Sequence, residues 1–161
     1  RPPEISGDLA ETDEVIVHAL DWLEEKRQLP AYACCIYPCV PFVTGESIRR
    51  VYAVLRRSDA DSAFTAATFV HPVWRGTRRS GAGWAEFQWP EYQHMRTQDL
   101  PELIHDAGQF YWFWVSKYRQ NPKLINDRSV PVVLPRWRVQ DIDNEEDWML
   151  AERLFEAEKS A

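Results

Sequence analysis

Several features that mark whole classes of protein are missing from this 161-residue sequence. No apolar run approaches the roughly 18 residues of a membrane-spanning helix, and no signal peptide opens the chain. There is no internal repeat and no low-complexity tract. An excess of positive charge is missing too, because the net charge is −6 and the isoelectric point is near 5.2. We therefore expect a cytoplasmic protein that binds neither nucleic acid nor membranes.

Cysteine is scarce, and its spacing matches no metal-binding or disulfide pattern. The three cysteines are Cys34, Cys35 and Cys39. Neighbouring residues of a strand point to opposite faces, so Cys34 and Cys35 are poor disulfide partners, and the sequence has no CxxC or Cys/His metal spacing. We predict three reduced thiols.

The composition is that of a packed globular protein. Hydrophobic residues make up 45% of the chain and aromatic residues 13%. A chain of this length is long enough to bury a sizeable core as one domain. We predict a single domain over residues 1–161.

Hydrophobic periodicity predicts alternating helices and strands. Apolar stripes at helical spacing predict helices over residues 12–26, 46–57, 116–121 and 145–159, and apolar or β-prone runs predict strands over 32–37, 62–70, 107–115 and 130–134. A helix between two buried strands is typical of a βαβ unit. We therefore predict an α/β fold with a mostly parallel sheet and flanking helices.

Glycine, proline and arginine interrupt this pattern between residues 71 and 104. Short hairpin strands are expected around residues 85–89, and such an inserted segment often serves as an arm or lid. It carries the basic run from Arg75 to Arg79, with Arg96 nearby. An anionic ligand would meet this patch, although a surface loop of the same composition is an equally good interpretation.

Asp141 and Asp143 form the most specific candidate site. Carboxylates at i and i+2 of an extended segment leave from one face, and two converging carboxylates suit Mg²⁺ that also binds substrate phosphates. An alternative interpretation stays open at this point. The segment DIDNEEDW can be a solvated acidic turn in which Asp143 or Asn144 caps the last helix.

Other reactive residue types do not form a recognisable motif. His105 and Asp106 are adjacent, and adjacent side chains of an extended segment diverge, so we expect a capping or loop-anchoring role. Ser47 and His18 match no nucleophile motif, and we expect no covalent catalysis.

Three segments resemble one family: CIYPCVPF (residues 35–42), RTQDLPELIHDAGQFYW (96–112) and LPRWRVQDIDNEEDW (134–148). They are similar to the acylneuraminate cytidylyltransferases, most closely the pseudaminic acid branch, in the expected order from about residue 1 to about 156. The resemblance implies a Rossmann-like nucleotide-diphospho-sugar transferase fold that lacks its first strands. It also implies a homodimer that couples CTP to a nine-carbon acidic sugar and releases pyrophosphate.

The resemblance assigns roles to individual residues. Asp141 and Asp143 match the family's Mg²⁺-binding aspartates, and Arg96 matches an arginine near the acidic sugar, so these three form the expected catalytic set. The residues expected to bind substrate are Arg75, Gln98, Gln109, Phe110 and Tyr111. For the last three, a core strand is the alternative interpretation.

The chain also departs from the family. Family members open with a strand, a loop rich in glycine and basic residues that binds the nucleotide phosphates, and two more strands, none of which this sequence contains. We therefore expect the chain alone to bind CTP poorly. Cys39 and Trp74 replace a threonine and a glutamine usual in the branch. A catalytically incomplete fragment or a non-enzymatic sugar-binding or interaction domain is the second hypothesis.

Overall fold

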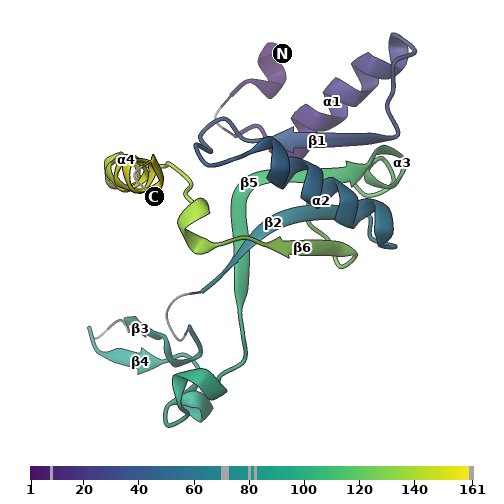
Figure 1. The fold of residues 1–161 in the computed structure, drawn as a ribbon. Coiled ribbons are helices and arrows are strands. Elements are labelled where there is room, and N and C mark those ends of the chain that lie inside the picture. Colours follow the sequence, from purple (N-terminus) through teal and green to yellow (C-terminus); the bar gives the residue numbers. More distant parts are fainter. Residues whose placement is uncertain (8, 70–72, 80, 82, 160–161) are drawn as a thin grey trace.

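The computed structural model describes residues 1–161 except 8, 70–72, 80, 82 and 160–161. Its centre is a four-stranded sheet in the order β1-β5-β2-β6, with helices on both faces (Figure 1). The strands are β1 Tyr32–Ile36, β2 Ser62–Thr68, β5 Ile104–Trp114 and β6 Ser129–Val133, and a separate hairpin joins β3 Thr77–Arg79 to β4 Ala85–Phe87. The helices are α1 Thr12–Glu25, α2 Gly45–Arg57, α3 Val115–Tyr118 and α4 Glu145–Lys159.

The predicted α/β class is confirmed, and the sheet is mixed. β5 runs antiparallel to both of its neighbours, β1 and β2, whereas β2 and β6 are parallel. Three strands therefore share one direction, but β5 lies between two of them. This happens because α2 carries the chain from β1 past one strand position to β2, and β5 later fills that position.

Each face of the sheet carries its own hydrophobic cluster. One cluster, on the side of α1, contains Leu20, Phe64 and Phe113. The other, on the side of α2, contains Leu55 and Phe110, both fully buried. Burying a side chain of this size stabilises the fold by about 1.5–3 kcal/mol. β5 contributes to both clusters because successive residues point to opposite faces.

Helix α2 begins at a capping box. The hydroxyl of Thr44 accepts a hydrogen bond from the backbone N–H of Ser47 at 3.1 Å, and the hydroxyl of Ser47 accepts one from the N–H of Thr44 at 3.1 Å. Both donors would otherwise lack partners at the helix start. The sequence predicts this helix and its threonine cap, and both are confirmed.

The segment between β2 and β5 forms an arm that carries the β3-β4 hairpin away from the main sheet (Figure 1). Trp74 anchors the base of the arm: its ring centroid lies 5.0 Å from that of Trp89 and 5.2 Å from that of Tyr92, and its indole N–H donates to the carbonyl of Pro101 at 2.8 Å. The expected hairpin is confirmed. The predicted ends of the second strand, at Val70, and of the arm, at residue 71, fall outside the described residues.

All three cysteines are free thiols, as predicted. Cys34 packs against the cluster under α2 and Cys35 against the cluster under α1, so the two side chains point apart. Burial, with a smaller contribution from Cys35, raises the pKa of the Cys34 thiol to about 12. Burial also raises the pKa of Cys35, whereas Cys39 is exposed.

We predict that iodoacetamide labels Cys39 well before the other two thiols. Alkylation proceeds through the thiolate, and a thiol with a pKa near 12 is ionised in only about 1 of 10⁴ molecules at pH 8. A raised pKa keeps the thiol protonated up to that pH, so the protection of Cys34 should persist through the whole neutral range. Mass spectrometry of native and urea-unfolded protein measures the difference. Equal labelling of all three cysteines in the native protein would contradict the burial of β1.

Candidate functional site

The candidate site lies where β1, β2 and β6 end and β5 begins. In open α/β sheets, ligands bind beyond the carboxyl ends of the parallel strands. The short helical turn Arg136–Arg138 (η5) and the start of α4 lie on this side of the sheet (Figure 1). The expected metal-binding aspartates therefore lie on the edge where this fold places ligands.

β5 is irregular at this edge. Phe64 of β2 pairs with Tyr111 and Ala66 with Asp106, so a single residue of β2 faces residues 107–110 of β5. The strand bends sharply there (Figure 1). Gly108, in the bend, has a φ of 63°, a left-handed conformation that glycine adopts without steric cost.

Asp106 stabilises the bend through hydrogen bonds to both of its carboxylate oxygens. One oxygen accepts the backbone N–H of Gly108 at 3.1 Å, and the other accepts the hydroxyl of Tyr111 at 2.6 Å. The imidazole Nδ1 of His105 lies 2.8 Å from the carbonyl oxygen of Asp106, away from this carboxylate. The expected loop-anchoring role is confirmed for Asp106.

The carboxylate of Asp141 lies directly over the backbone of Gly108. A Cβ atom placed on Gly108 would lie 2.7 Å from Oδ2 of Asp141, closer than real Cβ contacts. The other oxygen of Asp141 accepts the backbone N–H of Ile142 at 3.1 Å. Partial burial and the charge of Asp143, with smaller effects from Asp147 and Asp106, raise the pKa of Asp141.

Asn144 and Asp147 cap the last helix. The side-chain oxygen of Asn144 accepts the N–H groups of Glu146 and Asp147 at 2.9 and 3.1 Å, and a carboxylate oxygen of Asp147 accepts those of Asp143 and Asn144 at 3.2 Å each. The helix-cap interpretation therefore holds for Asn144. It does not account for Asp141, which lies outside the cap.

Gln109 links β5 to the turn that precedes the aspartates. Its side chain is 1% exposed, and its amide donates to the carbonyl of Arg138 at 2.5 Å. Its amide oxygen is buried and has no partner among the described residues. Arg138 in turn forms an ion pair with Glu158 of α4 at 2.6 Å. These contacts tie β5, η5 and α4 together.

The other two residues of the expected sugar-contacting trio are also buried. Phe110 is fully buried in the cluster under α2, and Tyr111 is 3% exposed and bonded to Asp106. Burial and the negative charge of Asp106 raise the pKa of Tyr111. Both side chains thus contact the protein interior, which is the position that the core-strand interpretation predicts.

The remaining predicted residues lie on the arm. The guanidinium of Arg75 donates to the hydroxyl of Thr97, while Arg96 is exposed and donates to Asp99 at 2.6 Å. Gln98 is exposed in the turn Thr97–Asp99. The structure therefore brings the arm residues together at one place. It brings Asp106, Gly108, Gln109 and Asp141 together at another.

Sequence reasoning missed the role of Gly108 in this arrangement. The signal is present in the string HDAGQFYW, because an isolated glycine within a β-prone run indicates a bulge or a close backbone approach. What the string cannot indicate is the approaching residue. Asp141 lies far along the chain.

The acidic pair suits a magnesium ion that also binds phosphate. Across the described part of the chain, no group of three or more histidine, cysteine or acidic side chains is arranged to bind a metal ion. Mg²⁺ needs fewer protein ligands, since one or two carboxylates commonly hold it together with water and substrate phosphates. Burial is the main cause of the raised pKa of Asp141, and repulsion from Asp143 adds to it; a bound cation would relieve that repulsion.

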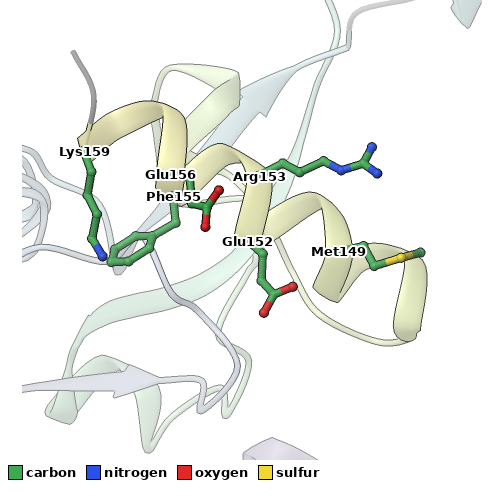
Figure 2. A pocket seen from close by; sticks show the side chains of 6 residues that line it. All are labelled: Met149, Glu152, Arg153, Phe155, Glu156 and Lys159. Carbon is green, nitrogen blue, oxygen red and sulfur yellow. The ribbon is translucent and has the colours of Figure 1, made fainter.

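Two hollows flank α4. One, of about 290 Å³, is mostly apolar and lies beside the aspartates, lined by Pro41, Ile142, Trp148, Ala151, Glu152 and Phe155. Figure 2 shows the other, whose lining residues all project from α4 itself: Met149, Glu152, Arg153, Phe155, Glu156 and Lys159. This second hollow therefore gathers none of the predicted site residues.

No helix in the described ranges is long and apolar enough to cross a membrane.

Curated proteins with similar sequences have pseudaminic acid cytidylyltransferase in their names. The chain is 26% identical over 155 residues to a pseudaminic acid cytidylyltransferase of Campylobacter jejuni, which covers 96% of this chain and 67% of the relative. The chain is thus similar to proteins named pseudaminic acid cytidylyltransferase. The expected resemblance is thereby confirmed, and the chain spans about two thirds of that relative's length. No family model matches the chain.

Two further comparisons agree with this result. A Helicobacter pylori protein named pseudaminic acid cytidylyltransferase and UDP-2,4-diacetamido-2,4,6-trideoxy-beta-L-altropyranose hydrolase is 27% identical over 143 residues, or 88% of this chain and 27% of that protein. The crystal structure of 4-diphosphocytidyl-2C-methyl-D-erythritol synthase from Anaerococcus prevotii matches with a TM-score of 0.54 and 13% identity, over 91% of this chain and 67% of that one. The latter likeness concerns the fold alone, and it agrees with the expected α/β architecture.

We predict that Phe110→Ala lowers the free energy of unfolding by about 3–5 kcal/mol, the usual cost of removing a buried phenylalanine. Phe87→Ala is the matched control, since Phe87 is 41% exposed on the arm, and it should change stability by less than about 1 kcal/mol. Urea denaturation followed by tryptophan fluorescence measures both. Equal effects of the two substitutions would contradict the placement of Phe110 in the core.

Proposed function

We propose that this chain carries the metal-binding and sugar-binding part of a nucleotidyltransferase that couples CTP to a nine-carbon acidic sugar such as pseudaminic acid. The products are the CMP-sugar and pyrophosphate. The proposal is carried by one observation: Asp141 contacts β5 at the carboxyl edge of the sheet, with Asp143 close enough to repel it, in a chain similar to proteins of this name. The contacted residue, Gly108, lies on the strand that also carries Asp106 and Gln109.

In this proposal, Asp141 and Asp143 would hold Mg²⁺ against the triphosphate of CTP. The ion would neutralise charge on the phosphates and on the departing pyrophosphate. The protein's own task would be to hold two carboxylates close together; burial and the charge of Asp143 both raise the pKa of Asp141, and a cation would offset both effects.

The arm would supply the contacts to the acidic sugar. A guanidinium pairs well with a carboxylate because its planar donors match both oxygens. Arg96 is suitable because it is exposed and already holds a carboxylate, that of Asp99, which a sugar carboxylate could replace. Arg75 and Gln98 would lie beside it through their contacts with the turn Thr97–Asp99.

We also propose that the active form is a cytoplasmic homodimer. Within one chain, the arm residues are separate from the aspartates, so the arm of a second copy is a natural source of sugar contacts. Three free thiols favour a reducing compartment.

We predict Mg²⁺-dependent release of pyrophosphate from CTP and pseudaminic acid by the longest polypeptide that the gene encodes. Asp143→Ala should lower kcat/KM at least about 100-fold, because it removes one carboxylate from the proposed ion site. Asp127→Ala is the control, since Asp127 is an exposed aspartate in the loop before β6. A coupled pyrophosphate assay measures both. Full activity of Asp143→Ala would refute the metal assignment.

The second candidate function is a domain that keeps the fold and the sugar pocket but does not bind the nucleotide by itself. The observation that favours it is the extent of the match, which covers 67% of the length of the Campylobacter relative. Titration calorimetry of the 161-residue chain with CTP and Mg²⁺ should then show no submillimolar binding. Tight CTP binding by this chain would contradict the second candidate and favour the first.

A further inference from the structure

We propose that Gly108 is the positioning residue for Asp141: the left-handed glycine in the bend of β5 forms the seat on which the Asp141 carboxylate rests. The inference rests on the proposed function in one respect, because the seat matters for catalysis only if Asp141 holds the metal ion. The seat itself is a property of the fold.

The contact is close and involves one oxygen and the carbon of the Asp141 carboxylate. A Cβ atom on Gly108 would lie 2.7 Å from Oδ2, 3.3 Å from Cγ and 3.7 Å from Cβ of Asp141. Any residue other than glycine would therefore push the carboxylate away from β5. Because Asp141 is tied to Ile142 by its other oxygen, it could not turn aside without losing that bond as well.

Hydrogen bonds hold both partners of the contact, Gly108 and the segment that carries Asp141. On one side, Asp106 fixes the N–H of Gly108 and is itself held by Tyr111, whose ring is in the core. On the other side, the buried amide of Gln109 holds the carbonyl of Arg138, three residues before Asp141. The two halves of the contact are thus anchored separately to the same strand.

The other glycines of the chain do not share this combination. Among the described residues, no atom lies within 4 Å of a Cβ placed on Gly7 or Gly81, whereas a Cβ on Gly76 would approach a turn carbonyl and one on Gly45 an arginine side chain. Gly83 also has a left-handed φ, 83°, and the neighbour that the described part of the chain places near its Cβ position is the guanidinium of Arg79, at 3.9 Å. Gly83 is therefore a matched control, with the same backbone conformation and no carboxylate.

A double-mutant cycle tests the seat without any nucleotide. Gly108→Ala should lower the melting temperature of the 161-residue chain, and this decrease should become clearly smaller in an Asp141→Ala background, where there is no carboxylate to displace. Gly83→Ala should give the same decrease in both backgrounds. If Gly108→Ala does not fold, Gly108→Asn places the same Cβ in a residue that tolerates left-handed backbone. The proposal would be overturned if substitutions at residue 108 lowered the melting temperature equally with and without the Asp141 carboxylate.

Mn²⁺ binding followed by electron paramagnetic resonance supplies the second readout. Residues that orient a metal ligand typically change metal affinity 10–100-fold when they are replaced, so Gly108→Ala or Gly108→Asn should weaken Mn²⁺ binding by about 10-fold or more, and Gly83→Ala should not. Unchanged affinity in the residue-108 variants would overturn the positioning role. The parent chain can also show coupling between residues 108 and 141 in the melting temperatures and yet bind no Mn²⁺. That result would support the contact between Gly108 and Asp141 and refute the proposed function.

Discussion

The contact between the Asp141 carboxylate and the bare backbone of Gly108 is the constraint on which the site depends. It joins the C-terminal segment to β5, an inner strand of the sheet, and it depends on residue 108 having no side chain and a left-handed backbone. The bend in β5 creates that backbone, and Asp106 stabilises the bend. Replacing Gly108 would therefore disturb the strand, the turn η5 and the acidic pair together.

The position of β5 in the sheet explains why its residues divide into two groups. Between β1 and β2, and covered on both faces, the strand has an interior half whose side chains fill the core, including Phe110 and Phe113. Its first residues extend beyond the end of β1, where Asp106 and Gly108 face the C-terminal segment. One strand thus provides both the rigidity of the fold and the floor of the candidate site.

The sequence allowed most elements to be predicted, because the signals of α1, α2, α4 and β1 are local. Apolar spacing and the Thr44 cap identify α2 to within one residue of its observed start. The antiparallel placement of β5 was not predictable, since it depends on pairing with strands distant in sequence. The strand also begins earlier than predicted: its first residues, Ile104–Asp106, pair with β2, and two of the three are polar. Likewise, the spacing of Asp141 and Asp143 indicated a site, but its partner on β5 could be seen only in three dimensions.

Paramagnetic relaxation by Mn²⁺ reports directly whether the acidic pair and the Gly108 bend form the proposed cation site. In a ¹⁵N-labelled chain titrated with Mn²⁺, we expect the amide signals of Gly108, Asp141 and Ile142 to broaden first, while those of Arg96 and the β3-β4 hairpin stay sharp. Broadening that begins elsewhere, for example at the acidic residues within α4, with sharp signals at Gly108, would show that the cation binds away from this bend.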